Sequence, residues 1–221
     1  MKVAGLALGG VEPLSYRGKT VRTGIFKTPT AGPLQLRLQG VEGDVQVDQK
    51  HHGGEDKAVY LYSLENLRYW AELRGEPPYA PGQVGENITV ADLEDASIHL
   101  GDRLEIGETQ IEVTQPRVPC FKLGLKMGDL KFVNQFLRSG RTGFYARVLR
   151  EGAVRLGDRV TVIHRDPQRV SIPEAMRALE PGPDRTAHLL KVLAVDGLSS
   201  AWRKDLEKRL SHSSQGDPHD P

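Results

Sequence analysis

Glycine and proline divide the first three quarters of this chain into short segments. The 221 residues contain 24 Gly and 14 Pro, and groups of them interrupt the chain about every 8–12 residues, which is typical of turns between short strands. Between these turns apolar and polar residues alternate. Leu34, Leu36 and Leu38, for example, are separated by polar residues, with the period of two expected of a half-buried strand. Residues 1–168 are therefore predicted to form a mainly β domain, either a barrel or a sandwich.

The same alternation predicts further strands at 41–47 and 111–113. A short apolar run predicts one at 58–62, and turns predict two more, at 104–106 and 160–163. The sequence Leu-Gly-Asp-Arg occurs twice, at 100–103 and 156–159, each time before one of these strands. Short repeats of this kind are common in all-β domains, so we interpret this repeat as two similar turns before strands and not as a functional site.

Two helices are predicted among the strands. Ser63 is suited to cap a helix that continues to Leu73, because apolar residues fall on one face of it. Asp129 is suited to cap a second helix, with Phe132 and Phe136 directed inward. These helices would be insertions in a fold that remains mainly β.

The pattern changes at about residue 170. Ser171 begins a capping box, and three helices are predicted between this residue and Leu210. A module of this size, residues 169–210, is too small to be firmly stable alone, so we expect it to dock on the β domain or on a partner. Residues 211–221 are polar without periodicity and are expected to be a disordered tail.

Composition excludes several classes of protein. Apolar residues make up 38% of the chain and charged residues 27%, which is typical of a globular domain and not of a disordered chain. No segment approaches the ~20 apolar residues that span a bilayer, so no membrane association and a cytoplasmic location are expected. The net charge of +1 makes nucleic acid an unlikely partner, although a few cations could still form a phosphate pocket.

Cys120 is the only cysteine. An intrachain disulfide is therefore impossible, and so is an iron–sulfur cluster held by this chain alone, which needs about four ligands. No flavin-binding signature is present either. If the protein carries out redox chemistry, electrons must come from a separate reductase.

The densest group of chemically active residues lies between Gly43 and Tyr60. His51-His52-Gly53-Gly54 leads into acidic residues and Lys57. Glycines allow a ligand to approach the backbone and leave N–H groups for an anion, and Lys57 would add positive charge. An ordinary polar turn favours the same residue types, so both interpretations stay open.

The sequence around Cys120 is Pro116-Arg117-Val118-Pro119-Cys120-Phe121-Lys122. Arg117 and Lys122 would favour the thiolate form of Cys120, which is the form that binds metal. The alternative is a small buried hydrophobic residue, but such residues rarely lie between these prolines and cations.

Two further segments are weaker candidates. Gly85-Glu86-Asn87 could be a bend that directs polar groups at a ligand, or a plain turn. Arg141 lies between glycines and could bind phosphate or be a solvated loop residue. A zinc site at His51, His52 and Cys120 is disfavoured by the ligand spacing, and a Cys–His hydrolase lacks any oxyanion-loop signature.

Taken together and in order, these motifs resemble the MOSC domain, named after the C-terminal part of molybdenum cofactor sulfurases, in its bacterial stand-alone, YiiM-like form with a C-terminal three-helix module. The resemblance extends over roughly residues 15–210. The matching segments are Gly43-Asp44, His51-His52-Gly53-Gly54, Asp56–Val59, Gly85-Glu86-Asn87, Pro116-Arg117, Pro119-Cys120 with Lys122, Gly140–Gly143 and Leu198–Arg203.

The resemblance implies a β-barrel that binds molybdenum cofactor (molybdenum–molybdopterin), with Cys120 as the protein ligand to the metal. Pyridoxal phosphate is not implied. Cys120, His51 and His52 would be the catalytic residues. The cofactor would be bound by Lys57, Gly53, Gly54, Glu86, Asn87, Arg117, Lys122 and Arg141, with Arg22 and Thr23 as weaker candidates.

The implied activity is that of an oxidoreductase that reduces small N-hydroxylated compounds, such as hydroxylaminopurines, to amines in a detoxification reaction. Electrons would come from a flavoprotein or iron–sulfur reductase. The alternative is a non-catalytic molybdenum cofactor carrier or sulfur-transfer module. The three-helix module could dock the reductase or simply pack on the barrel; DNA binding by its basic residues, among them Arg203 and Lys208, is the least favoured interpretation.

Overall fold

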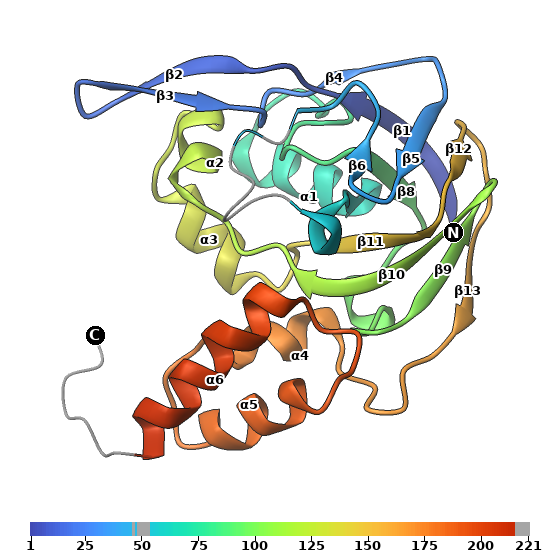
Figure 1. The fold of residues 1–221 in the computed structure, drawn as a ribbon. Coiled ribbons are helices and arrows are strands. Elements are labelled where there is room, and N and C mark those ends of the chain that lie inside the picture. Colours follow the sequence, from blue (N-terminus) through green and yellow to red (C-terminus); the bar gives the residue numbers. More distant parts are fainter. Residues whose placement is uncertain (46, 48–53, 215–221) are drawn as a thin grey trace.

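The computed structural model describes residues 1–45, 47 and 54–214 (Figure 1). Its largest element is an eight-stranded sheet in the order β13-β9-β10-β11-β7-β8-β1-β4. The strands are β1 (Lys2–Leu8), β4 (Thr28–Pro29), β7 (Val59–Ser63), β8 (Ile88–Ala91), β9 (Arg103–Ile106), β10 (Thr109–Pro116), β11 (Phe144–Arg150) and β13 (Val160–His164). Neighbouring strands are antiparallel except β7 and β8, which are parallel.

Two smaller sheets accompany the main one. One contains β12 (Gly152–Val154), β5 (Leu34–Arg37) and β6 (Gly40–Val41), and the other is a hairpin of β2 (Glu12–Tyr16) and β3 (Lys19–Thr23). The hairpin projects from the body of the molecule above helix α2 (Figure 1).

The main sheet curls until its two sides meet. Val3 donates its N–H to the carbonyl of Asp158 at 2.9 Å, and Val160 donates to Met1 at 3.0 Å. This seam is only an isolated bridge, between Lys2 and Arg159, and not a strand pair. The prediction of a mainly β domain is confirmed, but the described strands do not form a barrel closed by a continuous ladder.

The helices cover the sheet in two groups (Figure 1). The first group is α1 (Leu64–Arg74), α2 (Phe121–Lys126) and α3 (Phe132–Arg138), and the second is α4 (Ile172–Arg177), α5 (Arg185–Leu193) and α6 (Ser200–Ser214). Two 3-10 turns, η1 (Glu55–Lys57) and η2 (Asp95–Ser97), join strands. The second group is the C-terminal helical module expected from the sequence.

Helix starts follow the predicted caps in part. Ser63 and Ser171 cap α1 and α4 because each side chain accepts the backbone N–H of the third helical residue, Asn66 and Glu174 respectively. The expected cap at Asp129 is wrong: α3 begins only at Phe132, because the Asp129 carboxylate accepts the N–H of Lys131 in a preceding turn instead.

Three other features differ from the sequence analysis. Helix α2 has no counterpart among the predicted helices. Helix α6 continues to Ser214, so residues 211–214 belong to a helix and not to a disordered tail; the rest of that tail lies outside the described residues. The strand expected at 41–47 ends at Val41, because Gly43 takes a left-handed φ of 82° and turns the chain.

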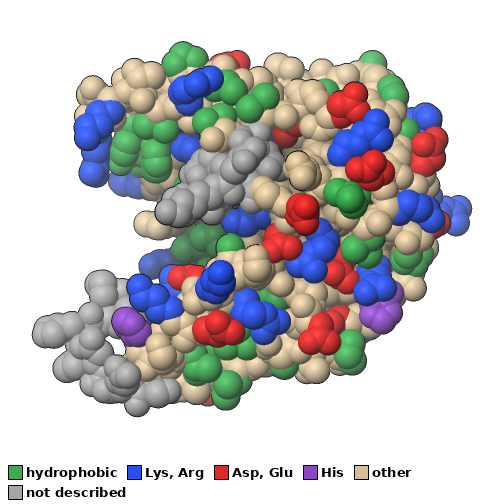
Figure 2. All heavy atoms as spheres, in the orientation of Figure 1, with side chains coloured by type: hydrophobic (Ala, Val, Ile, Leu, Met, Phe, Trp, Pro, Cys, Tyr) green, Lys and Arg blue, Asp and Glu red, His purple; other side chains and the backbone are tan. Residues whose placement is uncertain are grey.

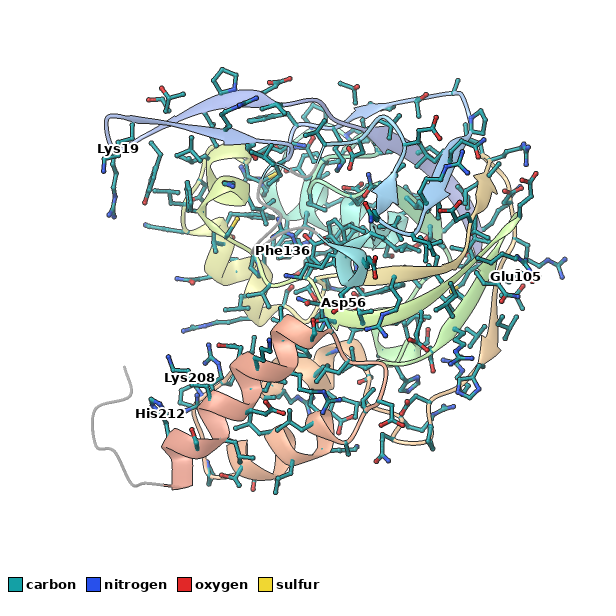
Figure 3. The ribbon with its side chains drawn as sticks, viewed as in Figure 1. Lys19, Asp56, Glu105, Phe136, Lys208 and His212 are labelled. Atoms are coloured by element: carbon teal, nitrogen blue, oxygen red, sulfur yellow. The ribbon has the colours of Figure 1, made fainter. Side chains whose placement is uncertain are left out.

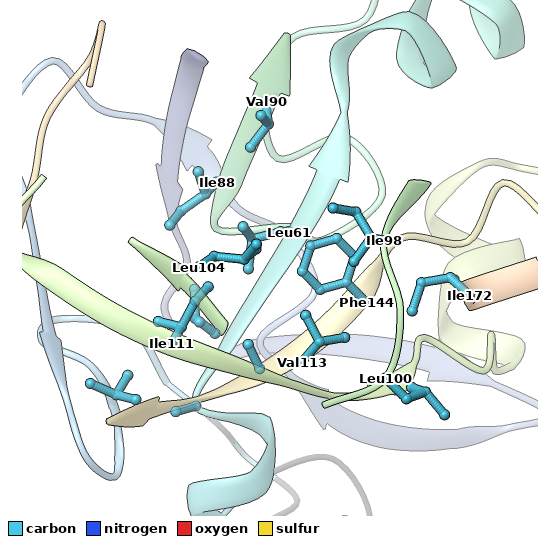
Figure 4. Close-up of a cluster of buried hydrophobic side chains, with 14 of the residues drawn as sticks. Leu61, Ile88, Val90, Ile98, Leu100, Leu104, Ile111, Val113, Phe144 and Ile172 are labelled. Carbon is cyan, nitrogen blue, oxygen red and sulfur yellow. The ribbon is translucent and has the colours of Figure 1, made fainter. Parts of the chain in front are cut away.

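The main core lies inside the curled sheet. Alternate residues of the central strands point into it, among them Leu61, Ile88, Leu104, Ile111 and Phe144 (Figure 4). Leu189, Val192, Trp202 and Leu206 of the C-terminal helices belong to the same buried cluster. The helical module therefore packs on the β domain through a shared apolar core.

An aromatic cluster lies on the other side of β7. Tyr60 and Tyr62 alternate with the core residues of this strand and pack with Trp70, Phe132 and Phe136. Their hydroxyls donate hydrogen bonds to two successive carbonyls, those of Thr142 and Arg141, both at 2.8 Å. The loop before β11 is thus tied to β7, which fixes the segment next to Arg117. No helix in the described part of the chain is long and apolar enough to cross a membrane.

A glycine in this loop gives the first test. Gly143 has φ of 64°, and a Cβ there would lie 2.4 Å from the carbonyl oxygen of Leu61. Gly128 has a similar φ of 67° but open space around it. We expect Gly143→Ala to lower the free energy of unfolding by about 3 kcal/mol, and Gly128→Ala by only about 1 kcal/mol, because only the first adds an overlap to the strain. Urea denaturation measures both; equal losses would contradict the packing described.

A buried carboxyl gives the second test. Asp95 accepts hydrogen bonds from the N–H of Gly143 at 2.7 Å and from Asn66, yet burial raises its pKa to about 6. This pKa is above that of Asp in the unfolded chain, so protonated Asp95 favours the folded state. Its contribution to the free energy of unfolding is complete at low pH and is lost as pH rises through 6.

We therefore expect wild type to lose about 2 kcal/mol of unfolding free energy relative to Asp95→Asn between pH 4.5 and pH 7. The exposed Asp196→Asn is the control and should run parallel to wild type. Parallel pH profiles for wild type and Asp95→Asn would refute the assignment.

Candidate functional site

A pocket lies where the end of β10, β7 and the start of α2 meet the segments around residues 23–27 and 44–47. It brings together Thr23, Lys57, Asn87, Arg117, Cys120 and Lys122, all of which were site candidates from the sequence. Figure 2 shows the molecule hollowed between the β2–β3 hairpin and α6, with Lys and Arg side chains on both rims.

Arg117 is the most unusual residue of this pocket. It follows β10 directly and is only 5% exposed. Its Nε and Nη1 atoms have no hydrogen-bond partner among the described residues. Aromatic rings flank the guanidinium, with the centroids of Tyr60 and Phe136 at 5.8 and 5.7 Å from Cζ. A buried cation with unsatisfied donors costs free energy unless an anion binds to it.

Neighbouring groups keep Arg117 charged. Burial lowers the pKa of Arg117, but Tyr60, Tyr145 and Cys120 raise it, and the net effect is a pKa above its ordinary value. Burial raises the pKa of Tyr60 and Tyr145 as well, so both are neutral phenols at physiological pH. The Arg117 charge in turn lowers the pKa of Tyr145, and the Nε and Nη1 atoms of Arg117 are left for a ligand.

Cys120 is half-buried at the residue before α2, and its thiol lines the same pocket. Lys122 and Lys57 line it as well. Lys57 comes from η1, the 3-10 turn that leads into β7. The thiol therefore lines a pocket with cations from two separate segments of the chain, η1 and the stretch from Arg117 to Lys122.

A polar network supports the opposite wall. Asp44 forms an ion pair with Lys27 and accepts hydrogen bonds from the N–H of Gly9 at 2.8 Å and from Asn87 Nδ2 at 3.0 Å. Asn87 Oδ1 accepts the N–H of Tyr60 at 3.2 Å. Burial lowers the pKa of Lys27 although Asp44 raises it. Asn87 thus joins β7 to Asp44 while it lines the pocket.

Among the described lining residues, four are cationic, namely Lys27, Lys57, Arg117 and Lys122, and one is anionic, Asp44. This excess of positive charge beside a thiol suits an anionic ligand such as a phosphate.

Four described sequence candidates do not line this pocket: Gly54 and the three charged residues Glu86, Arg141 and Arg22. Glu86 is fully buried, and its carboxylate accepts the N–H groups of Gly82 at 2.7 Å and Val84 at 3.0 Å, so it stabilises the turn that contains Gly85. Arg141 donates to Asn66 Oδ1 at 2.8 Å and stacks over Tyr69, beside a different cleft. Arg22 is exposed on β3.

The glycine of the Gly-Glu-Asn turn has a packing reason. Gly85 has φ of 93°, and a Cβ there would lie 2.9 Å from Cγ1 of Ile25. Only glycine allows this turn to pack against the segment that forms one pocket wall. His51, His52 and Gly53 lie outside the described residues; Gly54, with φ of 90°, immediately precedes η1.

Sequence reasoning missed Lys27, Tyr60 and Tyr145. The tyrosines had a partial signal, because each follows a candidate motif by two or three residues, Tyr60 after Lys57 and Tyr145 after Gly143. Only the strand register shows that Tyr145 pairs with Tyr60. Lys27 had no signal, since its position depends on an ion pair across 17 residues. Within the described chain no three His, Cys, Asp or Glu side chains group into a metal site.

The comparisons identify the family. Residues 48–161, just over half of the chain, match the MOSC domain, and residues 170–213 match the YiiM-like, 3-alpha helix domain. The chain is 36% identical over 207 residues to the "Uncharacterized protein YflK" of Bacillus subtilis, covering 94% of this chain and 93% of that protein. It is 31% identical over 165 residues to a "Reductase" of Gibberella moniliformis, covering 73% of this chain but 29% of that longer protein.

A solved structure agrees. The crystal structure of YiiM from Geobacillus stearothermophilus superposes with a TM-score of 0.78 at 31% identity, covering 94% of this chain and 98% of that one. With its matching sheet, its C-terminal helices and both domain matches, the chain belongs to the MOSC-domain family, in the YiiM-like group.

Proposed function

We propose that the pocket binds a molybdenum–pterin cofactor, with Cys120 as the protein ligand to the metal. The observation that carries this proposal is the pair of unsatisfied nitrogens on buried, charged Arg117, in the same pocket as the thiol. The terminal phosphate of such a cofactor would satisfy these donors. Membership of the MOSC family supports the same assignment.

The donor set suits a metal that arrives with its own ligands. One thiolate is a suitable soft ligand but cannot hold a metal ion alone, and no described cluster of side chains supplements it. Lys57 and Lys122 would neutralise the phosphate together with Arg117. When bound, the cofactor would supply two-electron oxygen-atom transfer. We do not propose Glu86 or Arg141 as cofactor contacts, because neither residue lines the pocket.

We further propose that the protein reduces N-hydroxylated compounds. The substrate R–NHOH takes up two electrons and two protons, its N–O bond breaks, and the products are R–NH₂ and water. Tyr145, held neutral by burial, is able to donate a hydrogen bond in the pocket, whereas the Tyr60 hydroxyl already donates to the carbonyl of Thr142. The electrons come from a separate reductase. The name "Reductase" of the fungal relative supports redox chemistry, although it describes a much longer protein.

Metal analysis tests the cofactor. We expect wild type, expressed in a host that makes molybdenum cofactor, to contain molybdenum and pterin, and Cys120→Ser to lose most of the metal or to change its absorption spectrum. Ser139→Ala, a half-buried residue outside the pocket, is the control. Wild type without molybdenum would refute the proposal, as would Cys120→Ser with an unchanged metal spectrum.

Turnover is tested with the same preparations. Wild type with a chemically reduced viologen dye as electron donor should convert a hydroxylaminopurine to the aminopurine. Loaded protein without turnover of any hydroxylamine would instead indicate a cofactor carrier.

Arg117 gives a test with two opposite results. Arg117→Met should lower cofactor content about tenfold or more, because the phosphate loses its buried partner. In the cofactor-free protein the same change should leave the free energy of unfolding within about 1 kcal/mol of wild type or raise it, since unsatisfied donors are removed. Arg117→Lys keeps the charge and should retain more cofactor than Met. A loss of stability with unchanged cofactor content would mean that Arg117 is structural.

A further inference from the structure

The start of helix α6 is bonded to the strand that leads to Arg117. Ser199, the residue before the helix, is fully buried and donates its hydroxyl to Gln115 Oε1 at 2.6 Å. Its N–H donates to the carbonyl of Thr114 at 3.1 Å. The same hydroxyl accepts the N–H of Trp202 at 3.1 Å, which caps the helix.

The next residue is bonded to the segment that carries Lys57. Asp56 Oδ2 accepts both the N–H of Ser200 at 2.8 Å and its hydroxyl at 2.9 Å. The carbonyl of Asp56 accepts the hydroxyl of Thr114 at 2.6 Å. Figure 3 shows Asp56 above the first turn of α6.

An arginine completes the junction. Arg147 Nη2 contacts Asp56 Oδ1 at 2.8 Å and donates to the carbonyl of Gly197 at 3.1 Å, while its Nη1 contacts Glu112 at 3.1 Å. Gly197 itself has no room for a side chain, since a Cβ would lie 2.8 Å from the Cα of Gly101. The chain entering α6 is therefore held on several sides.

These bonds are not needed merely to attach the helical module. Leu189, Val192, Trp202 and Leu206 already bury the module against the sheet, and apolar burial supplies most of the free energy of such packing. Individual polar bonds add little net stability, but they fix relative position. Here they concentrate at one point, directly beside the pocket wall.

We propose that Ser199 and Ser200, the α6 anchor, are positioning residues of the pocket. Asp56 is the immediate neighbour of Lys57 in η1, and Gln115 precedes Arg117 by two residues. The anchor holds both segments against one rigid helix and so sets where the two cations stand around the Cys120 thiol. Only the identity of the bound anion rests on the proposed function; the placement of the cations does not.

The only thiol of the chain serves as the reporter. In cofactor-free protein, the rate at which Cys120 reacts with the dianionic reagent dithiobis(nitrobenzoate) is divided by its rate with neutral dithiodipyridine. Attraction by nearby cations raises this ratio. Serine-to-alanine changes leave the charge of the chain unaltered, so a change in the ratio reports the position of the cations.

We expect Ser199→Ala/Ser200→Ala to lower the rate ratio about threefold or more, because a displaced cation attracts the dianion less. Ser200→Ala alone should lower the ratio as well. Ser200→Thr keeps the hydroxyl at this exposed position and should retain the wild-type ratio. In holoprotein, the anchor variant should lose molybdenum on dialysis about tenfold faster.

Two matched controls separate positioning from stability. Ser171→Ala removes the cap of α4 in the same module, and Ser211→Ala removes a hydroxyl at the far end of α6; neither contacts the pocket wall. An anchor variant whose rate ratio equals that of Ser171→Ala would overturn the inference even if wild type holds molybdenum. A lowered ratio in a protein that never binds molybdenum would refute the proposed function and support the inference.

Discussion

Strand β10 is the element on which the sheet, the helical module and the pocket all depend. Its backbone pairs with β9 on one side and β11 on the other. Thr114 and Gln115 near its end hold both η1 and the start of α6, and Arg117 follows directly. Because nearly every residue of β10 is buried, a shift of this strand by one residue would exchange its two faces and disturb all three regions together.

The pocket contrasts two ways of burying a cation. Lys27 has its counter-ion, Asp44, beside it in the same wall, so its charge is neutralised within the protein. Arg117 has aromatic faces and a phenol but no described carboxylate, and its donors stay incompletely satisfied. Lys27 therefore stabilises the pocket wall, whereas Arg117 has donors that are able to bind a ligand. Sequence reasoning treats both as basic residues, and only burial and partners distinguish them.

How far the sequence allowed prediction varies from residue to residue. Alternation identified β5 and β10, a short apolar run identified β7, and residue type identified the caps at Ser63 and Ser171, because all of these signals are local. Cys120, Arg117, Lys57 and Asn87 were expected to share a site, and the structure brings them to one pocket. Glu86 and Arg141 looked equally suitable, yet the first bonds to its own turn and the second to Asn66. Direction of a side chain depends on tertiary contacts, which local sequence does not encode. The seam between β1 and β13 was invisible for the same reason.

That seam and the shared core govern the order in which the chain is able to fold during synthesis. The carbonyl of Met1 and the amide of Val3 find partners more than 150 residues later, and Val3 and Leu6 share a buried cluster with Trp202 and Leu206. A ribosome delivers the chain from its N-terminus, so the first strand leaves the exit tunnel long before these partners exist. Strand β8 and the middle of the chain cover part of its apolar face earlier, but the buried cluster is complete only when α6 has been made. The nascent chain therefore carries an incompletely covered core through this interval, and helix α6, which holds the pocket in our proposal, is also the element that completes the core.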